Sequence, residues 1–292
     1  MIDTEPPQIQ IDPVITYNDT GFVMALVTQN GEYNLEVAAN NGNGRPSYAL
    51  VHDYPSVGGY PLGSLLIGGI VYRHQGRGLF LPQDASPAEV SAMYDRWAVN
   101  YSEQVPWTYE VGQNTFAILG ESGYQPGGRI LDIGCGTGNT SAGMVRSGVD
   151  ASCITGVDIS PEMLAVAQKS AEGASELHGV SLHQGNIIDW QPPKAGERFA
   201  AAVSALALHH IPPELRLRAF NNIHDLLIPK GLCTVVVSDK YREGLEMAGF
   251  IRRLSQGRVR EDVHIHQGIN GYDFELRYLT VQGENLLATS DI

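Results

Sequence analysis

The chain has 292 residues, of which 43% are hydrophobic and 17% charged, a composition typical of a globular protein with a sizeable core. Its formal net charge of -13 argues against nucleic-acid binding, which usually requires a basic surface, and favours a small-molecule substrate. No apolar run reaches the roughly 18 residues of a membrane span, and the acidic, proline-bearing N-terminus is unlike a signal peptide. We therefore expect a cytoplasmic protein without a membrane partner.

The cysteines do not indicate a disulfide framework or a zinc site. Cys135, Cys153 and Cys233 form no CxxC pair, and their number is odd. We expect three reduced thiols.

Residues 1–85 predict a separate N-terminal domain rich in β-structure. β-branched and aromatic runs alternate there with turn sequences, and they predict four strands in meander order, at 14–29, 33–40, 48–55 and 65–78. We expect a small antiparallel sheet.

Residues 86–292 predict a second domain in which helices alternate with strands. Ser86, Pro87 and Glu89 form a capping-box pattern that begins a helix, and a further helix is expected over 108–123. Later strands and helices alternate, and the chain ends in an antiparallel hairpin. The predicted strands are 128–134, 153–159, 180–186, 199–206, 231–239, 261–267 and 274–282, and the predicted helices between them are 138–148, 160–177 and 212–227. This order indicates an α/β fold, a doubly wound, Rossmann-like sheet of seven strands.

The glycine-rich stretch RILDIGCGTGNT, at 129–140, follows the first strand of that sheet, where such folds bind ligands. A triphosphate-binding loop requires a lysine, which this turn lacks. A dinucleotide-binding turn would place its third glycine at position 139, which is Asn139. Both nucleotide classes therefore fit poorly.

Two acidic residues favour a cationic adenosine ligand. Asp132 lies two residues before Gly134, where a carboxylate would repel a pyrophosphate and attract an ammonium or sulfonium group. The alternative is that Asp132 caps backbone amides of the turn. Asp158 ends the second strand, from where a carboxylate can accept both ribose hydroxyls. It could instead cap the following helix, although Ser160 before Pro161 suits that role better.

Five motifs occur in the order of a known family: YDRWAVNY (94–101), ILDIGCGTGNTS (130–141), ITGVDISPEMLAVAQ (154–168), ALALHHI (205–211) and LLIPKGLCTVVV (226–237). From residue 94 to its end the chain resembles the class I S-adenosylmethionine-dependent methyltransferases, in particular their small-molecule branch. The N-terminal domain is additional to that family core, and we expect it to act as a cap or lid.

The resemblance implies S-adenosylmethionine as the cofactor. The three glycines would approach its methionine part, and Asp132 its amino group, with Asp158 on the ribose. Tyr94 and Tyr101 would close over it, unless they are ordinary packing residues of a helix. Asn186 stands where the family commonly has an acidic residue that accepts the adenine amino group, and an amide oxygen can still accept that bond. The full expected cofactor-binding set is Tyr94, Tyr101, Asp132, Gly134, Gly136, Gly138, Asp158, Ile159, Met163, Asn186, Ile187 and Ser204.

The candidate catalytic residues are His209, His210, Asn139 and Tyr94. Either histidine could accept a proton from the substrate, or could shape the substrate site instead. A tyrosine ring could face the sulfonium. His264 and His266 lie on one face of a strand, but no third ligand completes a metal site, so we interpret both as surface residues and expect no metal.

Three functions remain open. The first is methyl transfer to a small metabolite. The second keeps the fold and cofactor but cyclises the cofactor itself, to azetidine-2-carboxylate and methylthioadenosine, with Asn139 contacting its amino group. The third is a non-catalytic S-adenosylmethionine-binding module, which the intact glycine and acidic motifs disfavour. An NAD-dependent oxidoreductase is disfavoured by Asp132 and Asn139. The sequence carries no signal for the acceptor or the oligomeric state.

Overall fold

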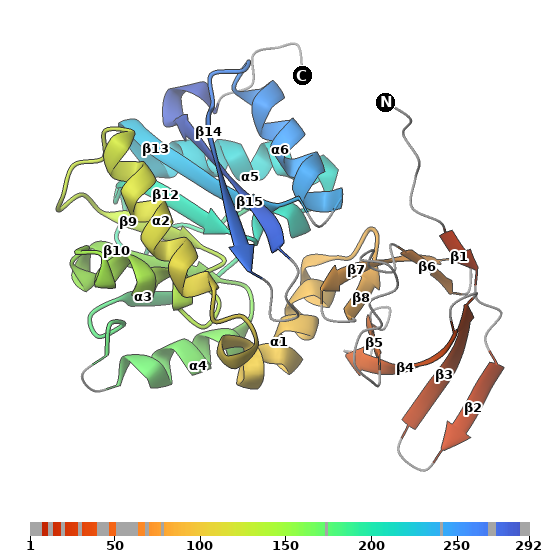
Figure 1. Ribbon diagram of the computed structural model, residues 1–292. Coiled ribbons are helices and arrows are strands. Elements are labelled where there is room, and N and C mark those ends of the chain that lie inside the picture. Colours follow the sequence, from red (N-terminus) through yellow and green to blue (C-terminus); the bar gives the residue numbers. More distant parts are fainter. Residues whose placement is uncertain are drawn as a thin grey trace. The chain divides into compact units, whose positions relative to one another are not determined.

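The structure is a computed structural model (Figure 1), and it describes residues 8–10, 14–18, 21–28, 31–39, 47–50, 64–67, 70–76, 79–172, 175–239, 242–267 and 273–286. The chain forms two compact units, Met1–Arg96 and Trp97–Ile292. Helix α1, Pro87–Gln104, contains the boundary between them. The division after residue 85 and the role of the first unit as a cap stay predictions.

The first unit contains an eight-stranded sheet with the order β1-β6-β7-β8-β5-β4-β3-β2. Its pairs are antiparallel except β1 with β6, which is parallel. The strands are β1 (Gln8–Gln10), β2 (Val14–Asn18), β3 (Gly21–Thr28), β4 (Gly31–Ala39), β5 (Ser47–Leu50), β6 (Ser64–Ile67), β7 (Ile70–Gly76) and β8 (Leu79–Pro82). Two of the four predicted strands are hairpins, because the sequences NDTG and GG interrupt them.

Among the described residues of this unit, the buried aromatic side chains lie on its central strands. Tyr72 and Phe80 are almost fully buried, and the rings of Tyr48 and Tyr72 meet edge to face with centroids 5.0 Å apart. The predicted capping box is confirmed at the start of α1. The Ser86 amide donates to Glu89 Oε2 at 2.8 Å, and the Glu89 amide donates to Ser86 Oγ at 3.3 Å.

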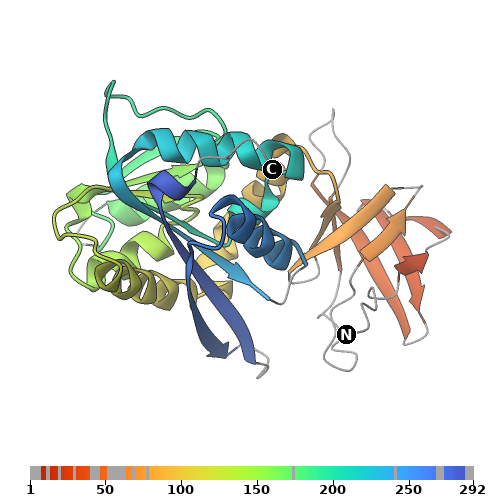
Figure 2. The same ribbon diagram turned by 90° about the horizontal axis from the view of Figure 1, so that it is seen from above.

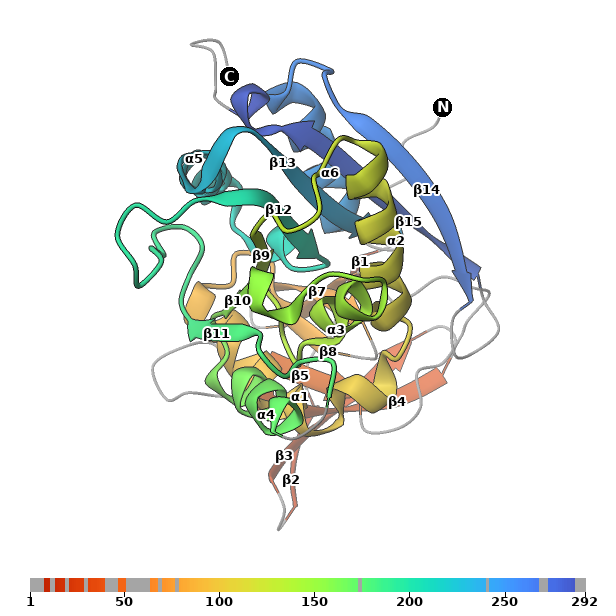
Figure 3. The ribbon, with the colours of Figure 1, turned by 90° about the vertical axis from the view of Figure 1, so that its left-hand side faces the viewer.

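The second unit contains the predicted seven-stranded sheet, with the order β11-β10-β9-β12-β13-β15-β14 (Figure 3). Strands β9 to β13 are parallel, and β15 is antiparallel to both β13 and β14, so the terminal hairpin is confirmed. The strands are β9 (Ile130–Ile133), β10 (Ile154–Asp158), β11 (Ser181–Gln184), β12 (Phe199–Ala205), β13 (Leu227–Ser238), β14 (Arg260–Gln267) and β15 (Asp273–Gln282). Strand β13 begins earlier than predicted, because its register on β12 shifts around Pro229 and Gly231.

Helices cover both faces of this sheet. The helices are α2 (Thr108–Glu121), α3 (Asn139–Arg146), α4 (Pro161–Ala171), α5 (Pro213–Leu226) and α6 (Arg242–Leu254), with short 3-10 turns at Ala151–Cys153 (η1), Leu208–His210 (η2) and Gly283–Asn285 (η3). Apolar side chains of α2 and α3 pack with those of β9 and β12, whereas those of α5 and α6 pack on the opposite face. Figures 2 and 3 show the ribbons of α2 and α5 on opposite sides of the sheet. None of the helices in the described part of the chain combines the length and apolarity of a membrane span.

Helices α2 and α3 approach unusually closely, at two glycines. A Cβ atom on Gly112 would lie 2.1 Å from the carbonyl oxygen of Thr140, and one on Gly143 would lie 2.1 Å from that of Tyr109. Only glycine permits this approach. The close contact fixes the position of Asn139, the first residue of α3, relative to the start of α2.

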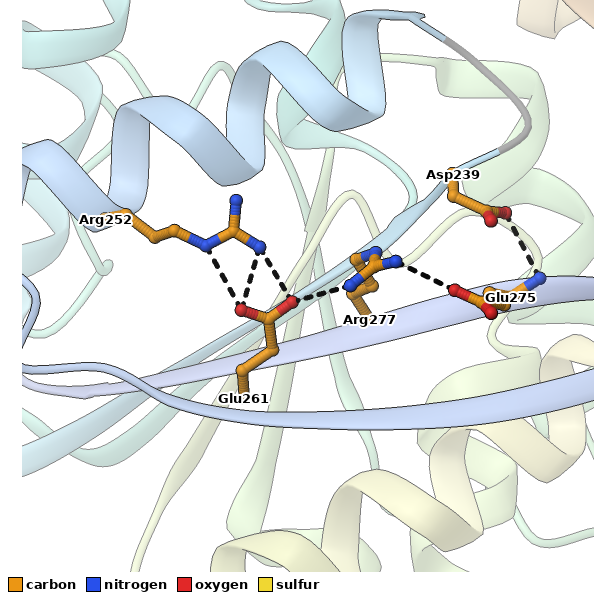
Figure 4. A network of polar contacts seen from close by, with 5 residues as sticks. All are labelled: Asp239, Arg252, Glu261, Glu275 and Arg277. Carbon is orange, nitrogen blue, oxygen red and sulfur yellow. Dashed lines mark hydrogen bonds and ion pairs between the residues drawn. The ribbon is translucent and has the colours of Figure 1, made fainter. Parts of the chain in front are cut away.

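A network of charged residues joins α6 to the terminal hairpin (Figure 4). Arg252 donates two hydrogen bonds from its Nη2, at 2.7 and 2.8 Å, to Glu261, and Arg277 Nη1 donates to the same carboxylate at 3.0 Å. Arg277 Nη2 also donates a hydrogen bond to Glu275 Oε2. The backbone amide of Glu275 in turn donates to Asp239 Oδ1, just after β13. Bidentate pairs of this kind fix geometry more than they add stability.

Candidate active site

The candidate site lies at the point where the strand order reverses, between β9 and β12. The glycine turn follows β9 and the segment 206–210 follows β12, so both loops meet at the carboxyl edge of the sheet. A Cβ on Gly134 would lie 2.2 Å from the Cβ of Ala207. Leu206 has a left-handed φ of 56° and donates its amide to the Val236 carbonyl at 3.0 Å. Strained backbone of this kind is often found at functional sites.

The three glycines of the turn have positive φ angles, but their surroundings differ. Gly134, Gly136 and Gly138 have φ values of 68°, 55° and 89°. Gly134 packs on Ala207, and a Cβ on Gly138 would lie 2.6 Å from Leu177 Cδ1. At Gly136 no described atom lies within 4 Å of the same position. Gly136 is therefore the glycine beside which a ligand has room.

Asp132 is a buried carboxylate with one unused oxygen. Its Oδ2 accepts a 2.6 Å hydrogen bond from Ser141 Oγ, whereas its Oδ1 has no partner among the described residues. Burial, together with the charge of Asp158, raises the pKa of Asp132 to about 6, and the Ser141 bond opposes this shift. A bound ammonium group would satisfy Oδ1 and favour the charged form.

Asp158 accepts backbone amides from both sides of the site. Its Oδ2 accepts from the amide of Gly136 at 2.8 Å, and its Oδ1 accepts from that of Ser160 at 2.8 Å. The predicted N-cap of α4 is confirmed as Ser160, whose Oγ accepts from the Met163 amide at 3.1 Å. Asp158 thus holds the turn at Gly136 next to the start of α4.

The expected adenine-binding residues follow β10 and β11. Met163 is buried, and Ile159 is half-buried. Asn186 Oδ1 accepts from the Ile188 amide at 3.1 Å, so the amide oxygen expected to accept from adenine already has one partner. Ile187 is buried, and its carbonyl accepts from Asn222 Nδ2 at 2.8 Å. Asn222 is a supporting residue that the sequence analysis did not identify.

The remaining expected cofactor-binding residues, Tyr94, Tyr101 and Ser204, lie on α1 and β12. Tyr94 belongs to the part of α1 in the first unit, and Tyr101 to the part in the second. The Tyr101 ring meets Trp97 edge to face at 4.9 Å. Ser204 lies on β12, and its buried Oγ has no partner within the described residues.

Asn139 is hydrogen-bonded at both ends of its side-chain amide. Its Oδ1 lies 3.1 Å from Ser102 Oγ, and its Nδ2 donates to Thr108 Oγ1 at 2.9 Å. Ser102 Oγ also lies 2.8 Å from Thr137 Oγ1. We call Ser102, Thr108, Thr137 and Asn139 the Asn139 cluster. Of the four, sequence reasoning selected only Asn139, because its partners lie more than 30 residues away in the chain.

His209 and His210 lie on the 3-10 turn after β12, with ring centroids 4.1 Å apart. Burial lowers the pKa of His210 to about 4. Burial lowers the pKa of His209 well below its ordinary value, with His210 and Arg216 adding to the shift. Both imidazoles are therefore neutral near pH 7, and can accept a hydrogen bond.

The interpretation of His266 as a surface residue is wrong. Its side chain is only 1% exposed, because α2 covers this face of the hairpin, and its ring lies 6.2 Å from that of Trp107 and 6.0 Å from that of Phe274. Its Nδ1 lies 3.5 Å from Glu110 Oε2. Burial lowers the pKa of His266, while Glu110 raises it. His264 is half-buried, against the Tyr278 ring. The described residues contain no cluster of three metal-ligating side chains.

Part of the chain is similar to known methyltransferases. Residues 130–231 match the family model of a methyltransferase domain. The chain is 28% identical over 162 residues to an uncharacterized methyltransferase of Emericella nidulans, covering 51% of this chain and 56% of that protein. It is 34% identical over 114 residues to trans-aconitate 2-methyltransferase of Escherichia coli O1:K1 / APEC, covering 39% and 40% respectively. The chain thus spans about half the length of the curated relatives it matches.

Among solved structures, the cyclase SpnF is similar with a TM-score of 0.51 at 17% identity, over 68% of this chain and 97% of that one. This likeness shows the fold alone. Residues 130–231, which contain the glycine turn between β9 and α3, are similar to a methyltransferase domain.

Proposed function

We propose that the protein is an S-adenosylmethionine-dependent methyltransferase that acts on a small molecule. The observation that carries the proposal is Asp132, a buried carboxylate with an unused oxygen on β9, just before the glycine turn that is open at Gly136. A buried unpaired carboxylate is costly, and an ammonium group of a ligand would offset that cost.

The residues present fit this cofactor. Asp132 would bind its amino group, Gly136 would leave room for its methionine part, and Asp158 would accept the ribose hydroxyls. When bound, the cofactor supplies a methyl group on a positively charged sulfur, which is transferred by in-line displacement. The protein's main contribution is then to orient the acceptor and to exclude water.

The two histidines lie at the same edge of the sheet and can bind the substrate that accepts the methyl group. His209 and His210 are neutral, so each offers a ring nitrogen that accepts a hydrogen bond from an acceptor hydroxyl or amine. With a pKa of about 4, His210 is a weak base near neutral pH. The low pKa favours a role for His210 in orienting the nucleophile rather than in removing its proton.

The fold by itself does not decide the reaction, since one protein of this fold is named a cyclase. Calorimetry with S-adenosylmethionine should show one binding site per chain, and Asp158→Asn should weaken it. Mass spectrometry after incubation with the cofactor alone should show it unchanged. Incubation with a panel of small metabolites, including the trans-aconitate of the Escherichia coli relative's name, should then yield S-adenosylhomocysteine. Methylthioadenosine with an amino-acid product, from the cofactor alone, would instead establish cyclisation.

A further inference from the structure

We propose that Asn139 is a positioning residue, which holds the segment 101–108 against the cofactor-binding turn and so sets the rate at which S-adenosylmethionine leaves. The inference rests on the proposed function, since the cofactor is the ligand concerned. Its basis is the Asn139 cluster, which joins the two ends of the α1–α2 connection to the residues on either side of Gly138.

The two bonds of Asn139 fall on either side of that connection. Ser102 lies in the last turn of α1, and Thr108 is the first residue of α2. Asn139 Oδ1 accepts a hydrogen bond from Ser102 Oγ at 3.1 Å, and Asn139 Nδ2 donates one to Thr108 Oγ1 at 2.9 Å. The close packing of Gly112 on α3 keeps the two helices in register for these bonds. One side chain therefore fixes both ends of the connection.

The chemistry of the cluster requires an amide at position 139. The single hydroxyl hydrogen of Thr108 is donated to the Val105 carbonyl at 2.7 Å, so Thr108 Oγ1 can only accept from a further partner. Asn139 supplies that donor through Nδ2, and on its other side supplies an acceptor for Ser102 Oγ. An aspartate of the same size would lack the donor and would repel Thr108 Oγ1.

The held segment carries aromatic residues beside the cofactor turn. Tyr101 precedes Ser102 and packs against the Trp97 ring. Trp107 precedes Thr108 and packs edge to face on Phe274, with ring centroids 5.1 Å apart. Through Ser102 the segment is hydrogen-bonded to Thr137, which lies between the open position at Gly136 and Gly138. Its displacement would uncover the turn, and its return would close it.

The test is stopped-flow measurement of S-adenosylmethionine binding to the full chain, followed by tryptophan fluorescence. Thr108→Val and Asn139→Ala should each speed dissociation by about tenfold or more, because both remove the bond between Asn139 and Thr108, worth about one buried hydrogen bond. Each also removes a second bond, that of Thr108 to the Val105 carbonyl or that of Ser102 to Asn139. The double variant should speed dissociation by less than the product of the two single effects, because the bond between Asn139 and Thr108 is lost only once. Thr108→Ser keeps the hydroxyl and should restore the slow rate.

Hydrogen exchange of residues 101–108 gives a second readout that does not need the cofactor. These amides should lose protection in Thr108→Val and Asn139→Ala, and keep it in the control Ser147→Ala, which removes a hydroxyl that bonds the Gly143 carbonyl at the other end of α3. Dissociation rates that multiply in the double variant, or unchanged exchange in the singles, would overturn the inference. If the wild type did not bind S-adenosylmethionine, the proposed function would fail, and the exchange data would still decide whether Asn139 holds the segment.

Discussion

Gly143→Ala should destabilise the second unit and displace the cofactor site together. The new Cβ would lie 2.1 Å from the Tyr109 carbonyl oxygen, whereas real Cβ atoms essentially never come within 3.0 Å of another atom. Helices α2 and α3 must therefore separate by about 1 Å, and the obstructing atom belongs to rigid backbone. Overpacking costs about 1–3 kcal/mol, and the higher helix propensity of alanine returns about 1 kcal/mol, so we expect a net loss of up to about 2 kcal/mol.

Urea unfolding followed by tryptophan fluorescence measures this change in the correct unit, because Trp97, Trp107 and Trp190 all lie within Trp97–Ile292. Gly120→Ala is the matched control. Gly120 lies on α2 with no described atom within 4 Å of its added Cβ, so alanine there should stabilise by about 0.5–1 kcal/mol. A Gly143→Ala variant as stable as Gly120→Ala would refute the close packing of the two helices. A destabilised variant with unchanged cofactor affinity would refute its link to the site.

Three further predictions concern titration and charge. The pKa of His210 is lowered to about 4, from about 6.5 in the unfolded chain, so between these pH values the unfolded chain binds a proton that the folded chain does not. The free energy of unfolding therefore decreases as the pH falls below about 6.5. Measured with urea, its difference between pH 7 and pH 5 should be about 2 kcal/mol larger in the wild type than in His210→Gln. The pKa of Asp132 is raised to about 6, so its charged form destabilises the fold above that pH. Asp132→Asn should therefore raise the melting temperature of the cofactor-free protein at pH 8, and should weaken S-adenosylmethionine binding by tenfold or more. A lower melting temperature in the variant would contradict this account. Glu261→Gln removes the shared partner of Arg252 and Arg277 at a half-exposed position, so the loss should stay within about 1 kcal/mol and should shrink in 1 M salt.

The seven strands and most helices of the second unit could be predicted because they have strong local patterns, whereas helix α6, Arg242–Leu254, was not predicted. Apolar runs such as those at β9 and β12 are buried on both faces, which is typical of a central parallel strand. The capping patterns at Ser86 and Ser160 depend on neighbours three residues away, so they too can be read locally. The sequence pattern of the first unit does not distinguish its hairpins from single long strands, because their turns are short and their flanks equally apolar.

His266 shows where local pattern stops being informative. Its alternation along β14 correctly predicts the strand, but whether a face of an edge strand is exposed depends on which helix covers it. Here Trp107 and Glu110, at the start of α2, lie over the ring. Those residues are more than 150 positions earlier in the chain, and no spacing near His266 indicates them.

Asn139 makes the same point for polar groups, and adds one exception. In the sequence Asn139 stands at the third-glycine position of a dinucleotide turn and is a candidate catalytic residue. Nothing near it indicates its partners Ser102 and Thr108, because they belong to another helix pair. Yet half of the constraint is local: Thr108, at the start of a helix, donates to the carbonyl three residues before it. Once that donor is used, the buried Thr108 oxygen needs a donor from elsewhere, and an amide at the glycine turn is a side chain that supplies one while accepting on its other side. A sequence therefore reveals an unsatisfied hydrogen-bonding group, and the fold decides which distant residue satisfies it.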